Sequence, residues 1–600
     1  MTENKWSFSK VFWPSFLAVI IASAVAMFFF FIVLGGIIGS FSEFGPEPLA
    51  INDNAILHMT LEGPIQDNGN SSFDVASFNL NETNGLSSLV YGLNKAKTDN
   101  KIKGLFIDIG DIQCGFSSAQ ALRKSIADFQ QSGKFVVTYF SGEMISQKAY
   151  YVGSVAKEVY AFPSSAFQLN GLGGEMMFFK NLLDKLEIEV EIVRGSNNDF
   201  KSAVEPFFRT NMSDSSRVQS ERFLQSIWQN MCAEMANSRG IVSTSFNSMA
   251  DSIQVTSSEH AKNFKLIDSL QYRDELMACL MKKMNVSETK DLSLCAFEEY
   301  AKNAFFDDQI LIQAQNANVA VITAEGDVSR DGDGIASRKI CRLFQKVRNN
   351  TAIKTVVFRI NSPGGSALAS EEIWREVFLT NKLKKVIVSM GDVAASGGYY
   401  IATPATRIFA EATTITGSIG VFGMIPYTGK MFENKLGINF DRVGTNSHAV
   451  LSLNKKLTPE ELSRIQGEVD VIYSQFLKRV SEGRRLSLER VMQIARGRVW
   501  TGEDALSIGL VDEVGSLQDA TNYAVKLAKI DAPKVIYYPL VKEDKLTSIF
   551  KLVEQETEDA EVKLKQNSIP ADLLAYYEQI KLIEGRMGIQ MRLPFDIKFD

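Results

Sequence analysis

Ser396 stands among alanines and glycines in the stretch GDVAASGGYYIAT, residues 391–403. Small neighbours allow a substrate to approach the hydroxyl closely, and at a strand-to-helix junction the N–H of Gly397 would face a developing oxyanion. The glycine-rich stretch NSPGGS, residues 361–366, follows the apolar run TVVFRI and offers further unobstructed N–H groups. A structural alternative is that the small residues of both stretches are needed only for tight turns. The pattern is compatible with a serine nucleophile without establishing one.

A serine hydroxyl is a weak nucleophile and needs a base, most often a histidine. The chain has three histidines. His58 lies in an apolar, strand-like run, His260 in a helical run and His448 in a polar run, and these contexts are typical of structural residues. A Ser-His-Asp triad is therefore poorly supported.

Lysine is the alternative base, provided that burial lowers its pKa. Lys201, in the stretch NDFKSAVEPFF, is the only lysine between Lys185 and Lys262, and it has apolar neighbours. Those neighbours favour a desolvated amine, whereas local sequence alone also allows a solvated lysine at a loop–helix junction. Lys201 is thus a candidate general base.

The two halves of the chain resemble each other at an offset of about 250 residues, which suits a duplicated domain. The stretch SGEMISQKAYYVGS, which starts at Ser141, aligns with MGDVAASGGYYIAT, which starts at Met390. Gln147 then takes the place of Ser396, and the second half has no lysine in the stretch equivalent to that around Lys201. This division, with the serine in one half and the lysine in the other, is expected if the two halves together form a single site. The sequence favours a pair within one chain and also allows a pair between subunits.

Short β-rich runs such as GLFIDI, FVVTYF, TVVFRI and KVIVSM each precede a segment with helical spacing. This alternation predicts α/β domains with mainly parallel sheets. We expect the first domain at residues 52–300 and the second at residues 317–535. Residues 536–600, which are rich in Lys, Glu and Leu, are expected to form a helical extension.

Residues 11–42 carry no charge, and these 32 residues exceed the roughly 20 that cross a ~30 Å hydrocarbon layer. We expect a transmembrane anchor, with a cleaved signal peptide as the alternative. Lys5 and Lys10 precede the span and acidic residues follow it, so the positive-inside rule predicts a cytoplasmic N-terminus, residues 1–10. The two expected α/β domains would then lie on the extracytoplasmic side of the membrane.

The composition excludes some classes of function. Apolar residues make up 45% of the chain, as in ordinary globular domains, and the formal net charge of −6 comes without a basic block, which argues against nucleic acid as a partner. The five cysteines lie singly, without the paired spacing of a metal site.

Five motifs carry a resemblance to a known family: RINSPGGS, GDVAASGGYYIA, TGSIGVFG, FKSAVEPF and GRVWTGEDALSIGLVDEVG. Together they resemble the signal peptide peptidase A family in its long, tandem-domain form, a family of membrane-anchored serine-lysine proteases. The resemblance covers residues 52–535 and the N-terminal anchor.

This resemblance implies a ClpP/crotonase-like α/β fold in each half, with no metal or organic cofactor. It assigns Ser396 as the nucleophile, Lys201 as the general base and Ser418 as the residue that orients the lysine. The backbone donors of the oxyanion hole fall on three glycines, Gly397, Gly365 and Gly364.

The resemblance also implies a homotetramer that forms a bowl over the membrane and degrades remnant signal peptides and other extended apolar peptides. One alternative is a catalytically inactive, membrane-tethered scaffold with a peptidase fold, against which the presence of both Ser396 and Lys201 argues. A second is a crotonase-type acyl-CoA enzyme, for which an extracytoplasmic site would lack coenzyme A.

Overall fold

The computed structural model describes Met27 and residues 51–67, 69, 71–74, 79–82, 85–314, 316–332, 334–539 and 588–593. The chain divides into two compact units, Met1–Asn52 and Asp53–Asp600, and both predicted α/β domains lie in the second unit. The predicted anchor, residues 11–42, lies outside the described residues except for Met27. Within the described part of the chain, no helix has the length and apolar character needed to cross a membrane.

The first half contains a parallel sheet with β4 and β5 near its centre. The apolar residues of these strands are buried on both faces, as expected for a parallel sheet covered by helices. All strand pairs in the sheet are parallel. The strand order is β10 (Ser269–Leu270), β7 (Glu158–Ala161), β5 (Phe135–Phe140), β4 (Ile102–Gln113), β1 (Ala55–Pro64) and β11 (Leu294–Ala296).

The second half contains an equivalent sheet. Its parallel strands follow the order β22 (Glu513–Val514), β18 (Arg407–Ala410), β17 (Lys385–Ala395), β15 (Thr355–Ser362), β12 (Val319–Glu325) and β23 (Val535–Tyr538). The long strand β17 pairs with β18 near its start and with β19 (Ile415–Gly417) at its end, and β21 (Val499–Thr501) runs antiparallel to β19. The six parallel strands in this order correspond one by one to those of the first sheet, whereas β19 and β21 have no counterpart there. The correspondence agrees with the duplication and confirms the α/β class with mainly parallel sheets.

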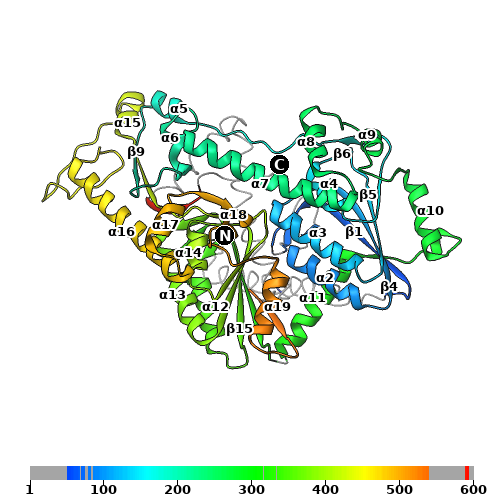
Figure 1. Cartoon of the computed structure of the whole chain (residues 1–600). Helices are drawn as coiled ribbons and strands as arrows, with labels where there is room; N and C mark the ends of the chain where they lie inside the picture. The colour runs from blue at the N-terminus through cyan, green and yellow to red at the C-terminus, as the bar shows by residue number, and fades with distance from the viewer. Residues whose placement is uncertain are drawn as a thin grey trace, which may run out of the picture. The chain divides into compact units, whose positions relative to one another are not determined.

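Alternate side chains of the central strands face different helices of the second half. Phe358 of β15 packs in a cluster with Phe344 of α12 and Ile373 of α13, whereas Val357 packs with Ala520 of α19. Figure 1 shows α12 and α13 on one side of this sheet and α19 on the other. The helices of the second half are α12 (Ser337–Asn349), α13 (Ala367–Leu383), α14 (Gly397–Ala402), α15 (Gly429–Leu436), α16 (Pro459–Arg484), α17 (Leu488–Ile494), α18 (Gly502–Ser507) and α19 (Leu517–Leu527).

The helices of the first half range from four to 26 residues in length, and the longest, α7, has a typical residue at each end. The 26-residue helix α7 begins after Ser213, whose hydroxyl accepts a hydrogen bond from the N–H of Ser216, and ends at Gly240 in the left-handed conformation. The helices are α2 (Leu86–Thr98), α3 (Phe116–Gln130), α4 (Gln147–Gly153), α5 (Lys180–Lys185), α6 (Glu205–Phe208), α7 (Asp214–Arg239), α8 (Ser243–Asp251), α9 (Ser258–Asn263), α10 (Arg273–Met284) and α11 (Phe297–Ala314), with 3₁₀ turns η1 (Ser202–Val204) and η2 (Thr289–Asp291). Short strand pairs β2 (Ser71–Asp74) with β3 (Asn79–Glu82), and β6 (Met144–Ile145) with β8 (Ala166–Phe167), complete this half.

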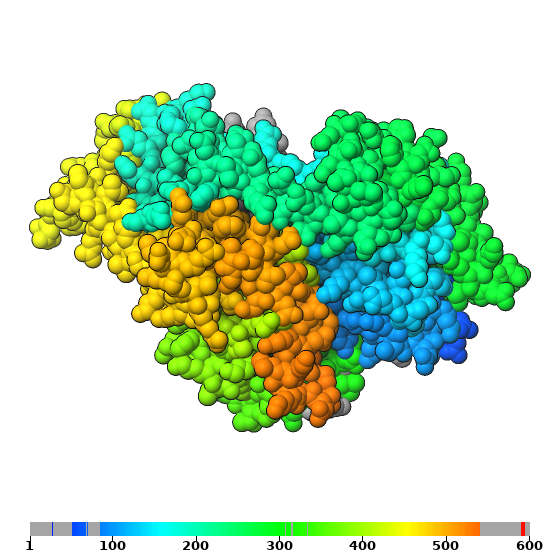
Figure 2. All heavy atoms as spheres, in the orientation of Figure 1, coloured from blue at the N-terminus to red at the C-terminus, as the bar shows by residue number. Residues whose placement is uncertain are grey.

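A third sheet joins the two halves. Its order is β14 (Ile335–Ala336), β13 (Val328–Ser329), β16 (Gly364–Ser366), β24 (Gly588–Arg592), β20 (Phe422–Tyr427) and β9 (Glu189–Arg194). The strand β9 comes from the first half and pairs antiparallel with β20 of the second half. From there α7 runs along the second half, and Ser226 of α7 hydrogen-bonds Thr501 of β21 at 3.0 Å. Figure 2 shows the teal atoms of this crossing segment, residues 180–239, against the orange atoms of the second half.

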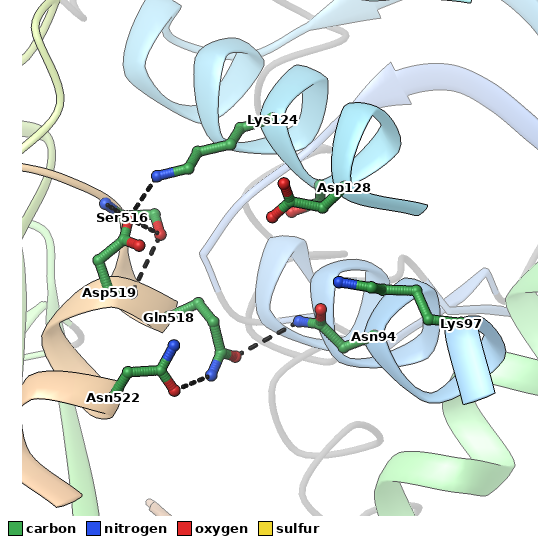
Figure 3. A pocket seen from close by; sticks show the side chains of 9 residues that line it. Asn94, Lys97, Lys124, Asp128, Ser516, Gln518, Asp519 and Asn522 are labelled. Atoms are coloured by element: carbon green, nitrogen blue, oxygen red, sulfur yellow. Dashed lines mark hydrogen bonds and ion pairs between the residues drawn. The ribbon is translucent and has the colours of Figure 1, made fainter. Parts of the chain in front are cut away.

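Buried and exposed polar pairs also connect the halves. The guanidinium of Arg359 donates hydrogen bonds to both carboxylate oxygens of Asp67, at 3.0 and 2.8 Å, and both side chains are almost completely buried. Nearer the surface, a polar pocket lies between α2, α3 and α19 (Figure 3), where Lys124 pairs with Asp519 at 2.6 Å. The halves therefore form one compact unit rather than two independent domains.

The structure adds two features to the domain bounds expected from the sequence. The first domain, expected at residues 52–300, is not self-contained, because residues 189–194 belong to a sheet with the second half. The C-terminal stretch, expected to be a helical extension, forms strands where it is described: β23 completes the sheet beside β12, and β24 pairs with β16 and β20. Residues 540–587 and 594–600 lie outside the described part of the chain.

Candidate active site

Ser396 occupies a sharp turn between the strand β17 and the helix α14. Its φ of 54° and ψ of −114° are unusual for a residue other than glycine, and such strain is concentrated at functional sites. The N–H of Ser396 donates to the carbonyl oxygen of Gly417 at 2.8 Å, and its own carbonyl accepts from the N–H of Tyr400 at 2.8 Å. The turn is thereby fixed on both sides, with the hydroxyl at the strand end and the N–H of Gly397 at the helix start.

Lys201 meets Ser396 within a single chain. Its Nζ lies 2.8 Å from Ser396 Oγ, 2.9 Å from Ser418 Oγ and 3.0 Å from the carbonyl oxygen of Ser418. All three residues are fully buried. Burial holds the pKa of Lys201 well below the usual 10.5 of a lysine, because it penalises the charged ammonium.

Ser418 lies between β19 and β20 with a φ of 49°. Its N–H donates to the carbonyl oxygen of Arg498 at 2.7 Å, which fixes the turn to the residues before β21. Both of its oxygens therefore face the lysine amine from one side. The structure thus brings together Lys201 of the crossing segment, Ser396 at the end of β17 and Ser418 at the end of β19.

The glycine loop lies beside this cluster. Gly364 and Gly365 have φ values of 106° and 151°, which favour residues without a side chain. A methyl group on Gly364 would lie 2.8 Å from the nitrogen of Gly397, so the loop backbone and the start of α14 are in close contact. The predicted oxyanion glycines, Gly397, Gly365 and Gly364, are consequently neighbours in space next to Ser396.

Sequence comparison places the chain among known peptidases. The model of peptidase family S49 matches residues 128–287, which contain Lys201, and residues 379–531, which contain Ser396. This chain belongs to peptidase family S49. The family assignment confirms the resemblance carried by the five motifs, and the chain is a serine peptidase of this family.

Individual relatives agree with the family assignment. Protease 4 from Haemophilus influenzae is 33% identical over 524 residues, which cover 84% of this chain and 83% of the relative. The chloroplastic serine protease SPPA from Arabidopsis thaliana is 31% identical over 495 residues, 81% of this chain and 71% of the relative. Among solved structures, ClpP1 from Listeria monocytogenes aligns with 35% of this chain and 96% of its own at a TM-score of 0.23 and 15% identity, a likeness too weak to carry an argument.

Three residues that the sequence did not single out hold Lys201 in place. Gln219 of α7 donates to the carbonyl oxygen of Phe200 at 3.1 Å and to Ser202 Oγ at 3.0 Å, on either side of Lys201, and accepts from the N–H of Val499 at 3.2 Å. Asn198 donates to the carbonyl oxygen of Val421 at 3.3 Å. Gly497 packs so closely that a methyl group on it would lie 2.5 Å from Lys201 Cβ. Nothing in the local sequence of these residues indicates such contacts, because their partners lie at least 17 positions away along the chain, and several lie in the other half.

The equivalent position in the first half has a different role. Gln147 is hydrogen-bonded through its amide to the carbonyl oxygen of Gly171 at 2.7 Å, and the adjacent Lys148 is buried over the ring of Phe116. Neither side chain provides a hydroxyl nucleophile. The first half thus contributes Lys201 to the candidate site, and its own residues at the position equivalent to Ser396 make packing and hydrogen-bond contacts.

The histidines lie in structural settings. His58 stacks on Phe106, with ring centres 4.7 Å apart, and His448 Nδ1 lies 3.0 Å from Glu461 at the surface. His260 lies within hydrogen-bonding distance of Thr256 on the same turn. These contacts agree with the structural roles expected from the sequence.

Proposed function

We propose that the chain hydrolyses peptide bonds with Ser396 as the nucleophile and Lys201 as the general base. The observation that carries this proposal is the 2.8 Å separation of Lys201 Nζ and Ser396 Oγ, since the residues are 195 positions apart and both fully buried. A purely structural role explains the pair poorly. A buried lysine surrounded by hydroxyl and carbonyl oxygens lacks a countercharge and costs stability when protonated.

The lowered pKa of Lys201 supports its role as a base. A neutral amine has two N–H groups and one lone pair, and Ser418 offers a hydroxyl and a carbonyl oxygen as acceptors for the two N–H groups. The lone pair then faces Ser396, whose proton it accepts as Oγ attacks a peptide carbonyl. Ser418 is accordingly the residue that orients the amine.

The proposed oxyanion hole consists of backbone N–H groups rather than side chains. As Ser396 Oγ bonds to the carbonyl carbon, the negative oxygen moves toward the N–H groups of Gly397 and Gly365, with Gly364 beside them. The lysine then returns the proton to the leaving amine, and water hydrolyses the acyl-enzyme by the same route. No metal or cofactor takes part in these steps.

The proposal extends to the substrate and the setting of the enzyme. We infer from the motif resemblance that remnant signal peptides and other extended apolar chains are cleaved, on the periplasmic side of the inner membrane. The uncharged residues 11–42 would act as the single membrane anchor. Assembly into a homotetramer belongs to the same proposal.

Covalent labelling tests the assignment of the nucleophile. A fluorophosphonate, or a peptide aldehyde with apolar side chains, should form an adduct on Ser396 of the wild-type chain. Ser396→Ala should fold, as judged by circular dichroism, and remain unlabelled, whereas Ser507→Ala, which alters an exposed serine of α18, should label normally. An adduct on a different serine of the wild-type chain would refute the assignment.

A further inference from the structure

Ser362, the last residue of β15, lies between the two walls of the proposed oxyanion hole. Its hydroxyl oxygen accepts a hydrogen bond from the N–H of Gly364 at 3.2 Å, which fixes the start of the glycine loop. A methyl group on Gly398 would lie 2.7 Å from the carbonyl oxygen of Ser362 and 3.1 Å from its Cβ. This fully buried residue therefore contacts both the glycine loop and the first turn of α14.

The sheet fixes the position of Ser362 relative to the nucleophile. The pairing of β15 with β17 shifts in register just before Ser362 and resumes with Ser362 opposite Ala394, two residues before Ser396. Across the shift, the side-chain oxygen of Asn361 accepts the N–H of Val393 at 3.1 Å. Because these bonds join Ser362 to β17, the loop that Ser362 holds is fixed relative to Ser396.

The hydrogen bond to Ser362 also determines which N–H groups are left for a substrate. The N–H of Gly364 already has an acceptor within the loop. Of the three glycines predicted for the oxyanion hole, this leaves Gly365 and Gly397 as donors. A methyl group on Gly397 would lie 3.2 Å from the nitrogen of Gly365, so the two donors are neighbours.

The first half shows that the fold does not require the turn at Ser362. In the repeat, Asp111 takes the place of Ser362, and neither glycine of the loop has a glycine as its counterpart. There the strand β4 continues to Gln113, which pairs with Pro64 of β1, whereas β12 pairs with β15 only as far as Asn361. The turn therefore belongs to the half that contains the nucleophile, and a general need of the sheet does not explain it.

We propose that Ser362 is a positioning residue, whose hydroxyl holds the glycine loop so that the N–H groups of Gly365 and Gly397 together face the developing oxyanion. This inference rests on the proposed function. Ser362 forms no bond to the substrate and acts only through the loop. Backbone donors stabilise a transition state best when they are fixed before the reaction begins, so loss of the hydroxyl should slow the chemical step rather than weaken substrate binding.

Steady-state kinetics of the full-length protein test this role. Ser362→Ala leaves the N–H of Gly364 without its acceptor, so the loop should lose its fixed position. The kcat on an apolar peptide should fall about 10- to 100-fold with little change in KM, because a displaced donor stabilises the oxyanion less than a fixed one. A folded Ser362→Ala chain with the kcat of the wild type would refute the proposal.

A pair of inhibitors separates the oxyanion hole from substrate binding. A peptide aldehyde bonds to Ser396 and places the resulting oxygen in the hole, whereas the corresponding peptide alcohol binds without this bond. In Ser362→Ala, the inhibition constant of the aldehyde should rise about tenfold and that of the alcohol should stay unchanged. Equal weakening of both inhibitors would show a general distortion of the groove and would overturn the positioning role.

Two further variants complete the experiment. Ser258→Ala is the matched control, because Ser258 is an equally buried serine of α9 whose hydroxyl donates to the carbonyl oxygen of Ser165 at 2.8 Å, and it should leave all four constants unchanged. If Ser362→Ala does not fold, Ser362→Cys carries the test, since a thiol is a weaker acceptor of similar shape. It should weaken the aldehyde and not the alcohol, and an unchanged aldehyde constant would refute the proposal.

The wild-type chain distinguishes this inference from the function on which it rests. A wild-type chain that neither hydrolyses the peptide nor forms an aldehyde adduct on Ser396 would refute the proposed function itself. Hydrolysis by the wild type together with unchanged constants in Ser362→Ala would refute only the role of Ser362.

Discussion

Lys201 determines how activity should depend on pH. The amine can accept a proton only when neutral, and burial holds its pKa well below 10.5 in the folded chain. Activity should therefore rise with pH through one ionisation that lies well below 10.5, measured as kcat/KM on a peptide free of titrating groups. Lys201→Arg should lose activity by on the order of 10⁴-fold or more, because a guanidinium stays protonated. A flat profile in the wild-type chain would contradict this assignment.

The same lysine links folding to protons. The folded chain keeps Lys201 neutral at pH values where the unfolded chain keeps it protonated, so the unfolded state binds more protons and stability rises with pH. This gain occurs between the lowered folded pKa and the usual 10.5, at up to about 1.4 kcal/mol per pH unit. In Lys201→Met the gain should disappear. Chemical denaturation of both chains between pH 8 and pH 10 measures the difference in slope, and equal slopes would contradict the linkage.

At the residue scale, the sequence indicates the two side chains of the proposed dyad more clearly than the residues that hold them in place. Ser396 and Lys201 stand out because each lies in an unusual composition and because the two halves differ at these positions. Gln219 and Gly497 do not stand out, since a glutamine on a helix and a glycine in a turn are common. Their roles depend on contacts between segments that the chain brings together only after folding.

The helix α7 is the element that positions the lysine. Gln219→Ala should remove the hydrogen bonds that hold the backbone around Lys201 and leave the N–H of Val499 without its acceptor. A fall in kcat of about 10- to 100-fold with little change in KM is expected, because misplacement of a base by a fraction of an ångström affects the chemical step. Val218→Ala, on the exposed face of the same helix, is the control and should behave as wild type. An unchanged kcat in Gln219→Ala would show that α7 does not position the base.

At the element scale, local pattern predicts the central strands and fails for β9 and β24. The runs TVVFRI and KVIVSM form β15 and β17 because continuous apolar, β-branched residues suit a sheet buried on both faces. Gly588–Arg592 alternates apolar and polar residues from Ile589 onward, but the run has only five residues and its pairing partners lie more than 150 positions away. The strand character of such a segment comes from the two strands that it pairs with, β16 and β20.

The buried ion pair between Asp67 and Arg359 is the connection between the halves that should be most costly to break. Asp67→Asn leaves a fully buried guanidinium without its countercharge, so the free energy of unfolding should fall by about 3–5 kcal/mol. Urea denaturation followed by fluorescence measures this loss. The exposed pair Arg407–Glu513 is the control, and Glu513→Gln should change stability by less than about 1 kcal/mol. Equal effects of the two variants would contradict the importance of burial.

Removal of the N-terminal segment tests the organisation of the whole molecule. A chain that lacks residues 1–46 should be soluble and still cleave unfolded polypeptides, because Lys201, Ser396 and Ser418 all lie in the second compact unit. The measurement is hydrolysis of an added polypeptide by the detergent-free protein, compared with the full-length chain in detergent. Loss of activity in a folded truncated chain would mean that the segment contributes to the site.

At the scale of the whole molecule, the internal repeat correctly predicts two equivalent parallel sheets in one chain. It does not predict that residues 180–239 leave their own sheet and pack on the other half. A repeat reports what two segments have in common, whereas the crossing segment is where the halves differ. The packing of residues 180–239 on the second half nevertheless agrees with the sequence, in which the first half has the lysine and the second half has the serine.

The crossing segment also determines at what stage of synthesis the chain can become proteolytically active. The first half leaves the ribosome with Lys201 but without Ser396, and the second half alone contains Ser396 without its base. Under the proposed mechanism, a nascent or truncated copy therefore has half of a dyad and cannot digest neighbouring proteins while it is being synthesised. Under the same mechanism, proteolysis begins only when β9 has paired with β20, a step that requires the chain at least as far as Tyr427. Co-production of the two halves as separate polypeptides would turn this protein into a split enzyme whose activity reports their association.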